Sequence, residues 1–572
     1  MTNFEIKSKD LGGRIGKLQT KHGEIETPTV LPVINPNKRT LEPAEIKETG
    51  AQALITNAYI LKKDHLHEVM TKGIHNFLNF HGPIMTDSGA YQLMRYGEVE
   101  TTNKEILEFQ EKINTDIGVI LDIPTQSKDR EEIQRTVEKT IKRSEETQEQ
   151  IKNKETLYVG PLQGWREPEL FRECVKKQSK LNFDIHALGS IVPTMEKYKY
   201  SKLIEPLRII KEEAPENRPI HLFGAGHPML FPFLVAMGAD LLDSAAYSLY
   251  ADDGRYLTSR GTKKVKEMEY LPCNCPVCTE NELKEIQENK QKLAKHNLHV
   301  TFKEIRKIKQ SIREGTLYEL METRSRAHPS LKKLMDTLTS DMRTIEKRDP
   351  ITKKHLFIVS EYSEKRPDYK RAIKKSKQLT QEGKLETTKI PGFGEVPRAL
   401  LECYPYSHIG EETLKEEKTP KTIVSDLKKL KIASKYWLGI DIIPEDVEIK
   451  KSPKTGRIRK LVKEGELYLV VRPSDHMFLL HGAAKKLHEE TEYPEQRISM
   501  KDEAVEFVEK GKTVFNKFVE EVDPDLRPGE PVLIVDKNDK LLASGETYLC
   551  SKEIKELEKG EAAKNRWHKE KT

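Results

Sequence analysis

Three aspartates close short apolar runs, and their side chains are suited to nucleophilic or acid–base chemistry. The runs are PIMTDS with Asp87, IGVILDI with Asp122 and ADLLDSAA with Asp243. One such aspartate taken alone is more simply explained as the cap of a following helix. Three carboxylates that share one site repel one another unless their proton chemistry is used. The set therefore indicates a catalytic group.

A second group of reactive side chains lies in LPCNCPVC, where Cys273, Cys275 and Cys278 form a C-x-C-x-x-C motif. Three thiolates within six residues can face one metal ion, and a fourth ligand can come from His296 or His299 in LAKHNLHV. Three cysteines and one histidine make a closed tetrahedral set. The motif therefore predicts one structural Zn²⁺ per chain, whereas three free thiols in a loop is the weaker alternative.

The elements that must position the aspartates are eight short apolar runs, each followed by an amphipathic, charged stretch. Runs that are apolar on both faces and separated by helices are typical of a parallel sheet covered on both sides. Eight such units in about 250 residues fit a (β/α)8 TIM barrel, an α/β fold, better than an open sheet. The runs are Thr29–Ile34, Ala51–Ala58, Pro83–Ser88, Ile117–Ile123, Thr156–Gly164, Phe183–Ser190, Pro219–Gly226 and Ala239–Ala246.

Such a barrel predicts where the reacting groups lie, because catalytic residues of this fold sit at the carboxyl ends of the strands. The polar and glycine residues at those ends are expected to share one mouth. They are Asp87, Asp122, Gln163, Gly189–Ser190, Gly224–Gly226 and Asp243.

The rest of the chain divides into smaller predicted domains. We expect the catalytic barrel over residues 1–340, with a zinc-binding subdomain at about 271–300 and a helix beginning near Asn281. An α/β domain of unknown role follows over 341–435, then a small α+β domain over 436–497. The latter contains the basic segment Lys450–Lys463, either a solvated hairpin or a phosphate contact. A small β-rich domain ends the chain at 498–572.

Composition excludes several classes of protein. The 572 residues carry 98 Lys and Arg against 92 Asp and Glu, and this net charge of +6 permits a nucleic-acid partner without indicating one. The most apolar long stretch, Pro228–Tyr250, contains Asp240 and Asp243, so it is expected in a core and not in a membrane. No signal peptide is apparent, and six cysteines are too few for a disulfide scaffold. We therefore expect a protein of the reducing cytoplasm.

Seven motifs in order make the chain resemble the tRNA-guanine transglycosylases. They are TDSGAYQ, ILDIP, GPLQG, ALGS, LLDSAAY, the C-x-C-x-x-C motif and the HNL that begins at His296. The C-terminal extension with GKTVFNKFV and LRPGE resembles the archaeal form, which ends in a PUA RNA-binding domain. The resemblance implies replacement of guanine 15 in the D-arm of tRNA by 7-cyano-7-deazaguanine (preQ0), a step toward archaeosine.

The resemblance also implies roles for single residues. Asp243 matches the nucleophile that forms a covalent bond to ribose, and Asp87 matches the general acid/base, although the reverse assignment stays open. This is the two-step logic of a retaining glycosidase. Asp122 is expected to accept hydrogen bonds from N1–H and the 2-amino group of the base. The further substrate-binding residues are Gln163, Gly189, Ser190, Ser88 and Tyr91, of which Tyr91 is either a stacking partner of the base or a core aromatic.

The family further implies partners and the choice of zinc ligand. The PUA domain is expected to bind the acceptor stem of tRNA, with Lys512 and Lys517 contacting RNA. Unstacking the D-arm base requires free energy, and binding of tRNA by the remote PUA domain offsets it. His296 is the expected fourth zinc ligand, with His299 as the alternative, and the family tends to form homodimers through the zinc region.

Three other functions compete with base exchange. The paralogous archaeosine synthase modifies preQ0 already in tRNA, but its barrel does not keep the full set of Asp87, Asp122, Gln163 and Asp243. A non-catalytic tRNA-binding scaffold would not need these carboxylates. A barrel aldolase or decarboxylase would need a lysine or an open metal site at the mouth, and these strand ends supply no such lysine.

Overall fold

The computed structural model describes residues 4–90, 101–125, 127–151, 155–383, 385–408 and 424–568. Its contacts divide the chain into two compact units. The first contains residues 1–313 and 320–338, and the second contains 314–319 and 339–572. Each unit is described by itself.

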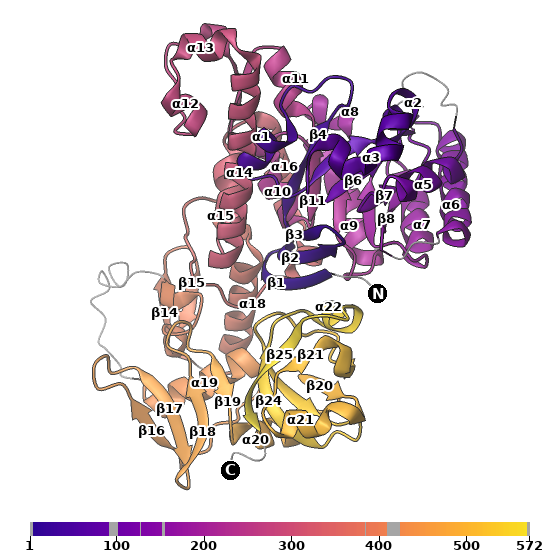
Figure 1. Cartoon of the computed structure of the whole chain (residues 1–572). Coiled ribbons are helices and arrows are strands. Elements are labelled where there is room, and N and C mark those ends of the chain that lie inside the picture. The colour runs from indigo at the N-terminus through magenta and orange to yellow at the C-terminus, as the bar shows by residue number, and fades with distance from the viewer. Residues whose placement is uncertain are drawn as a thin grey trace. The chain divides into compact units, whose positions relative to one another are not determined.

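A closed barrel of parallel strands forms the centre of the first unit (Figure 1), which confirms the predicted fold class. The ring closes where β11 pairs with β4, with Leu241 opposite Thr29. Each strand lies within one of the eight predicted apolar runs. The strands are β4 (Thr29–Ile34), β5 (Leu54–Asn57), β6 (Ile84–Asp87), β7 (Ile117–Val119), β8 (Leu157–Leu162), β9 (Ile185–Leu188), β10 (Ile220–Leu222) and β11 (Leu241–Ser244).

Amphipathic helices surround this barrel because their apolar residues recur at helical spacing. In α6 (Arg130–Gln150), Ile133, Val137 and Ile141 lie four residues apart on one face, and they pack with Leu170 of α7 (Pro168–Ser179). The side chain of Asp129 caps α6 by accepting a hydrogen bond from Glu132 N at 2.9 Å. Other helices of the ring are α3 (Leu66–Leu78), α5 (Asn103–Lys112), α9 (Ile204–Glu213) and α10 (Phe231–Ala236).

A three-stranded antiparallel sheet, which the sequence analysis did not predict, precedes the barrel. It consists of β1 (Phe4–Asp10), β2 (Gly13–Thr20) and β3 (Gly23–Thr27). Buried Arg14 donates to both oxygens of Asp240, each at 2.8 Å, just before β11 begins. His22 and His75 each lie 2.9 Å from Asp116, just before β7. The sheet therefore covers the amino end of the barrel, opposite the strand ends that carry the predicted site.

The segment after the barrel holds the cysteines. It forms a hairpin of β12 (Arg255–Thr258) and β13 (Gly261–Lys264), then α12 (Pro276–Glu280), α13 (Leu283–Glu288) and α14 (Lys290–Glu314). The expected start of a helix near Asn281 is wrong for the helix that carries His296. Asn289 is extended, and its side chain accepts a hydrogen bond from Gln291 N at 2.9 Å, so α14 begins at Lys290.

The second unit contains all three predicted C-terminal segments. Leu430, Leu461 and Leu533 belong to one buried apolar cluster, so these segments share a core. Two larger sheets have the strand orders β16-β17-β18-β19 and β21-β25-β24-β23-β20-β22. The described α-helices and strands that lie wholly in this unit are α17 (Arg343–Glu346), α18 (Pro367–Glu382), β14 (Thr387–Ile390), β15 (Gly394–Pro397), α19 (Asp426–Leu438), β16 (Glu448–Lys451), β17 (Ile458–Lys463), β18 (Glu466–Val471), β19 (Phe478–Leu480), α20 (Ala483–Glu490), β20 (Arg497–Met500), α21 (Val505–Glu509), β21 (Val514–Phe515), β22 (Val519–Val522), β23 (Pro531–Val535), β24 (Leu541–Thr547), α22 (Ser551–Glu556) and β25 (Glu561–His568).

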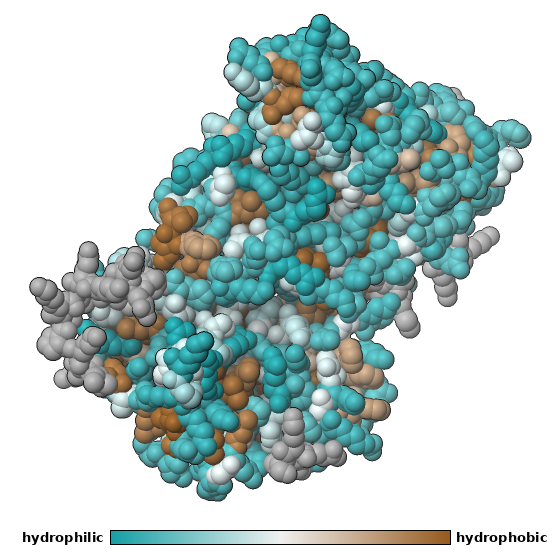
Figure 2. Space-filling model, turned by 60° about the vertical axis from the view of Figure 1, so that its left-hand side comes forward, coloured by the Kyte–Doolittle hydropathy of each residue, from teal (hydrophilic) through white to brown (hydrophobic). Residues whose placement is uncertain are grey.

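Residues 228–244 of the apolar stretch Pro228–Tyr250 are all buried in the barrel unit, whereas Leu249 near its end is exposed. None of the described helices is both long enough and apolar enough to span a lipid bilayer. The face of the molecule seen in Figure 2 is largely hydrophilic, as expected from a chain that is 33% charged.

Candidate functional site

A cavity of about 820 Å³ opens at the carboxyl end of the barrel, a size usual for small-molecule sites. Loops and strand ends from around the ring contribute to its wall. Six predicted site residues line it: Asp87, Asp122, Gln163, Gly189, Ser190 and Asp243. The structure therefore brings together residues that lie up to about 150 positions apart in the sequence.

Asp243, at the end of β11, presents one carboxylate oxygen to the protein. Its Oδ1 accepts a hydrogen bond from Gly224 N at 2.9 Å and lies 2.9 Å from Nε2 of His221. His221 is fully buried in β10, so its ring is fixed by packing. Within the described residues Oδ2 has no hydrogen-bond partner, and this oxygen is available for reaction. Gly224 has a φ of +71°, and a Cβ there would lie 2.4 Å from Val192 Cγ2.

Asp87, at the end of β6, has a different environment. Asn57 at the end of β5 donates from Nδ2 to Asp87 Oδ2 at 3.1 Å. Burial raises the pKa of Asp87 to about 7, and the negative charges of Asp122 and Asp243 add to this rise. Backbone N–H groups of Ser88 and Gly89 oppose it. A carboxyl group with this pKa exchanges protons readily near neutral pH.

Asp122, Gln163 and Ser190 form a hydrogen-bonded chain on the cavity wall. Ser190 Oγ donates to Gln163 Oε1 at 2.9 Å, and Gln163 Nε2 donates to Asp122 Oδ2 at 2.5 Å. Burial raises the pKa of Asp122 to about 6, although the bond from Gln163 favours its charged form. Gly189 lies against this chain, because a Cβ there would be 2.4 Å from Gln163 Nε2. The chain fixes amide and carboxylate groups of the kind that read the edge of a base.

Sequence reasoning missed three residues that position this site. They are His221 against Asp243, Asn57 against Asp87, and Arg143, whose Nη1 donates to the backbone oxygen of Leu121 at 3.0 Å and of Asp122 at 3.3 Å. For His221 and Asn57, the sequence did offer a signal, because each is a polar side chain inside or at the end of a predicted barrel strand.

One predicted residue does not line the cavity as expected, and a second lies outside the described residues. Ser88 is fully buried and is not part of the cavity wall, and within the described part of the chain its Oγ has no hydrogen-bond partner. Tyr91 lies outside the described residues, so its predicted role stays a prediction.

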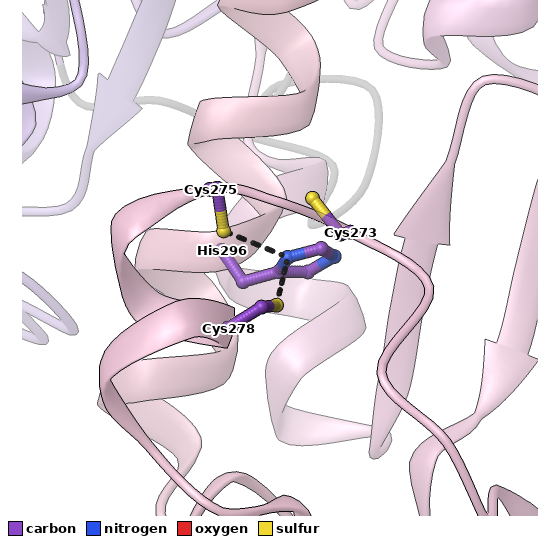
Figure 3. Close-up of side chains that lie close together, drawn as sticks. All are labelled: Cys273, Cys275, Cys278 and His296. Carbon is purple, nitrogen blue, oxygen red and sulfur yellow. Dashed lines mark hydrogen bonds between the residues drawn. The ribbon is translucent and has the colours of Figure 1, made fainter.

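The predicted metal ligands converge on one point in the barrel unit (Figure 3). His296 Nδ1 lies 3.4 Å from Cys275 Sγ and 3.3 Å from Cys278 Sγ, and Cys273 Sγ lies within the same cluster. Tetrahedral zinc with its usual bond lengths separates sulfur from nitrogen by roughly 3.5 Å. Hydrogen bonds with Cys275 and Cys278 hold the pKa of Cys273 below its usual value. The cluster could therefore hold a metal ion without rearrangement.

The surroundings of His296 orient its ring for ligation. Its Nε2 lies 3.0 Å from the Leu257 carbonyl oxygen, which leaves Nδ1 free to face the thiols. The ring of Tyr256 stacks on it with 3.7 Å between centroids. His299, the alternative ligand, is not part of the cluster, and its buried Nε2 has no partner among the described residues.

The predicted RNA-binding lysines lie in the second unit. Lys512 and Lys517 are both exposed, and Lys517 Nζ lies 4.4 Å from the ring centre of Phe518. Neither lysine forms an ion pair with a described residue, so both charges are available to a polyanion.

Comparisons with known families match three regions of the chain. Residues 9–330 match the family described as Queuine tRNA-ribosyltransferase. Residues 438–494 match the patch-forming domain C2 of tRNA-guanine transglycosylase, and residues 496–568 match the PUA domain.

Curated relatives match nearly the whole length. A protein of Thermococcus onnurineus named tRNA-guanine(15) transglycosylase is 42% identical, covering 98% of this chain and 98% of its own. Proteins with the same name from Pyrococcus furiosus and Methanocaldococcus jannaschii are 41% and 38% identical, and each covers at least 98% of both chains. These matches confirm the resemblance found in the motifs. The chain therefore belongs to the tRNA-guanine transglycosylase family of pentosyltransferases and ends in a PUA domain.

Proposed function

We propose that this enzyme replaces guanine 15 in the D-arm of tRNA with preQ0, through a covalent bond between Asp243 and the ribose. The names of the curated relatives, tRNA-guanine(15) transglycosylase, support position 15. The observation that carries the proposal is that Asp87 and Asp243 line one cavity but have different environments. Two carboxyl groups whose environments differ are suited to different roles in one reaction.

In the first step, Asp243 attacks C1′ of ribose 15 through the oxygen that has no partner among the described residues. The bond between C1′ and N9 of guanine breaks, and its electron pair leaves with the base. Asp87 in its protonated form donates a proton to the departing guanine, for which a pKa of about 7 is favourable.

In the second step, N9 of preQ0 attacks C1′ and the bond to Asp243 breaks, returning the electron pair to the carboxylate. Asp87, now ionised, accepts the proton that N9 loses. The two displacements retain the configuration at C1′, and no proton is gained or lost overall. The hydrogen bonds of His221 and Gly224 to Oδ1 support Asp243 as the nucleophile, because they fix one oxygen and orient the other.

The hydrogen-bonded chain of Asp122, Gln163 and Ser190 is proposed to recognise the base. Asp122 accepts from N1–H and the 2-amino group, which guanine and preQ0 share. Gln163 and the backbone at Gly189 bind the remaining edge. The pairing of Gln163 with Asp122 supports this role, because it holds both groups in place before the base arrives.

We also propose one structural Zn²⁺ per chain, held by Cys273, Cys275, Cys278 and His296. Four protein ligands leave no position for substrate, so the ion stabilises the segment between β13 and α14 and takes no part in exchange. The family also implies a homodimer through this region. Sedimentation of native and metal-depleted protein tests both ideas, since loss of the metal should lower the dimer fraction.

The test of the proposed function uses tRNA that carries labelled guanine at position 15, incubated with preQ0. Wild-type enzyme should release label and form a protein–RNA adduct that survives denaturation. Asp243→Asn should do neither, while its affinity for tRNA stays within about twofold, because an amide is not a nucleophile. An adduct at the wild-type rate in Asp243→Asn would transfer the role to Asp87. Absence of label release by the wild type would favour the archaeosine synthase or scaffold alternatives.

A further inference from the structure

One exposed segment at the rim of the cavity takes no part in the chemistry above. It runs from Lys197, just after α8 (Val192–Glu196), to Lys202 within the 3-10 helix Tyr200–Leu203. The segment follows β9, so it belongs to the same mouth as Gly189 and Ser190. Its sequence, KYKYSK, alternates basic and aromatic residues. This alternation is typical of surfaces that bind single-stranded nucleic acid.

Tyr198 is held in an unusual way within this segment. Its φ is +54°, a left-handed conformation that a bulky residue rarely adopts. Its side chain is 47% exposed and lines the cavity. Burial of this ring therefore does not explain the strained backbone. A strained residue that is not buried indicates a functional constraint.

The ring of Tyr198 is supported from behind. It stacks on His328 with 4.7 Å between centroids and an angle of 21°, and the centroid of the Tyr200 ring lies 5.9 Å away at an angle of 65°. His328 comes just before α16 (Pro329–Ser340) and belongs to the same unit as the barrel. The stacked His328 ring covers one face of the Tyr198 ring, while the side chain still lines the cavity and keeps almost half of its surface exposed.

The lysines around Tyr198 are not neutralised. Lys197, Lys199 and Lys202 are exposed, and none of them forms an ion pair with a described residue. The acidic residue just before the segment, Glu196, is exposed as well, so the local charge is about +2. Elsewhere in the barrel unit, exposed lysines such as Lys72 and Lys177 pair with a glutamate one turn away. Unpaired lysines at the rim therefore complement a phosphate backbone.

We infer that Tyr198 stacks on the base next to the exchanged guanosine in the opened D-arm, and that Lys197, Lys199 and Lys202 bind the adjoining phosphates. A nucleotide whose base enters the cavity leaves its neighbour unstacked at the rim, where an aromatic ring replaces the lost stacking. The inference rests on tRNA as the substrate and on base exchange in this cavity, and it does not depend on preQ0. Tyr198 is thus a positioning residue and Asp243 a catalytic one.

The test uses the full-length enzyme and labelled guanine as the incoming base. Tyr198→Ala should lower kcat/KM for tRNA about 5- to 150-fold, the range that loss of one base–aromatic stack implies. Tyr198→Phe should retain most of the activity, and KM for guanine should not change in either variant. Tyr270→Ala, which removes an aromatic side chain that is 80% exposed and does not line the cavity, is the matched control.

A tRNA lacking one flanking base separates stacking from a general loss of fold. For the wild type, removing the base at one of the two flanking positions should lower kcat/KM as much as Tyr198→Ala does. For the Tyr198→Ala variant, the same abasic tRNA should lower kcat/KM no further. Additive effects at both positions would overturn the inference, as would wild-type kcat/KM in Tyr198→Ala. Tyr198→Gly should lose activity without lowering the thermal midpoint, because glycine accepts a φ of +54°.

The lysines are tested by tRNA binding without turnover, so the result stands even if the enzyme exchanges another base. Changing Lys197, Lys199 and Lys202 to Gln should reduce the salt slope of binding by about 2, at roughly 0.7 per lost contact. The same change at Lys104, Lys139 and Lys142, exposed on α5 and α6, is the control. An equal reduction in both variants would overturn the inference, because the rim lysines would then act only through net charge. If the wild-type enzyme does not exchange guanine 15, the proposed function is wrong, whereas the inference about the lysines still stands or falls on the binding result.

Discussion

Replacing Asp87 with asparagine should change how the stability of the barrel unit depends on pH. In the folded protein the pKa of Asp87 is about 7, raised by burial and by the charges of Asp122 and Asp243. In the unfolded chain an aspartate has a pKa of about 3.9. Between these values the folded protein keeps a proton that the unfolded chain has lost. Wild-type stability therefore falls as the pH rises from about 4 to about 7, and the neutral amide of the variant removes this loss.

The size of the effect follows from the two pKa values. Between pH 5 and pH 8 the free energy of unfolding of Asp87→Asn should gain about 2–3 kcal/mol relative to wild type. Hydrogen bonds altered at Asn57 add an offset that does not depend on pH and cancels in this difference. For a unit of roughly 330 residues, the gain corresponds to a relative rise in thermal midpoint of roughly 4 °C.

Thermal unfolding of both proteins at several pH values measures this difference. Glu145→Gln, which removes an exposed carboxylate from α6, controls for the change in net charge. Exchange activity should fall about 10²- to 10⁴-fold in Asp87→Asn, the usual contribution of a general acid or base. If the midpoints of variant and wild type keep a constant separation from pH 5 to pH 8, Asp87 is ionised throughout and the acid/base assignment loses its support.

Three further changes test the rest of the site. Gly189→Ala should raise KM for the base about 10- to 100-fold at nearly constant tRNA affinity, because the added Cβ would displace the Gln163 amide from Asp122. Unchanged base binding in this variant would refute the role of that amide. His296→Ala should lower zinc content and thermal stability together, whereas His299→Ala should keep the metal; the opposite pattern in metal analysis would exchange the two ligands. Changing both Lys512 and Lys517 to Gln should weaken tRNA binding and reduce its salt slope by about 1.5, leaving KM for the base unchanged. An unaltered slope would show that these two lysines do not contact tRNA.

The substitutions at Lys512 and Lys517 are preferable to deletion of the chain from residue 498. Leu533 in that segment packs in the same apolar cluster as Leu430 and Leu461. Deletion would expose this core, so a loss of tRNA binding would not separate contact from misfolding.

The sequence by itself determined the barrel and the position of its mouth. Strands buried on both faces must be apolar, and the charged helices between them must be amphipathic, so the alternation of the eight runs is visible in one sequence. Asp87, Asp122 and Asp243 could be placed at one mouth because all parallel strands of a barrel end on the same side. The cysteine motif was equally local, since its three thiols lie within six residues.

Only the tertiary structure decided which groups touch. His221 and Asp243 are 22 residues apart, and Asn57 and Asp87 are 30 apart, so their contacts follow from strand register, which the apolar pattern does not specify. His296 and His299 lie three residues apart on α14, where a rotation of about 60° and a rise of about 4.5 Å separate them. Of these two, only His296 reaches the cysteines, because α12 packs on that face of the helix and the Leu257 carbonyl orients the ring.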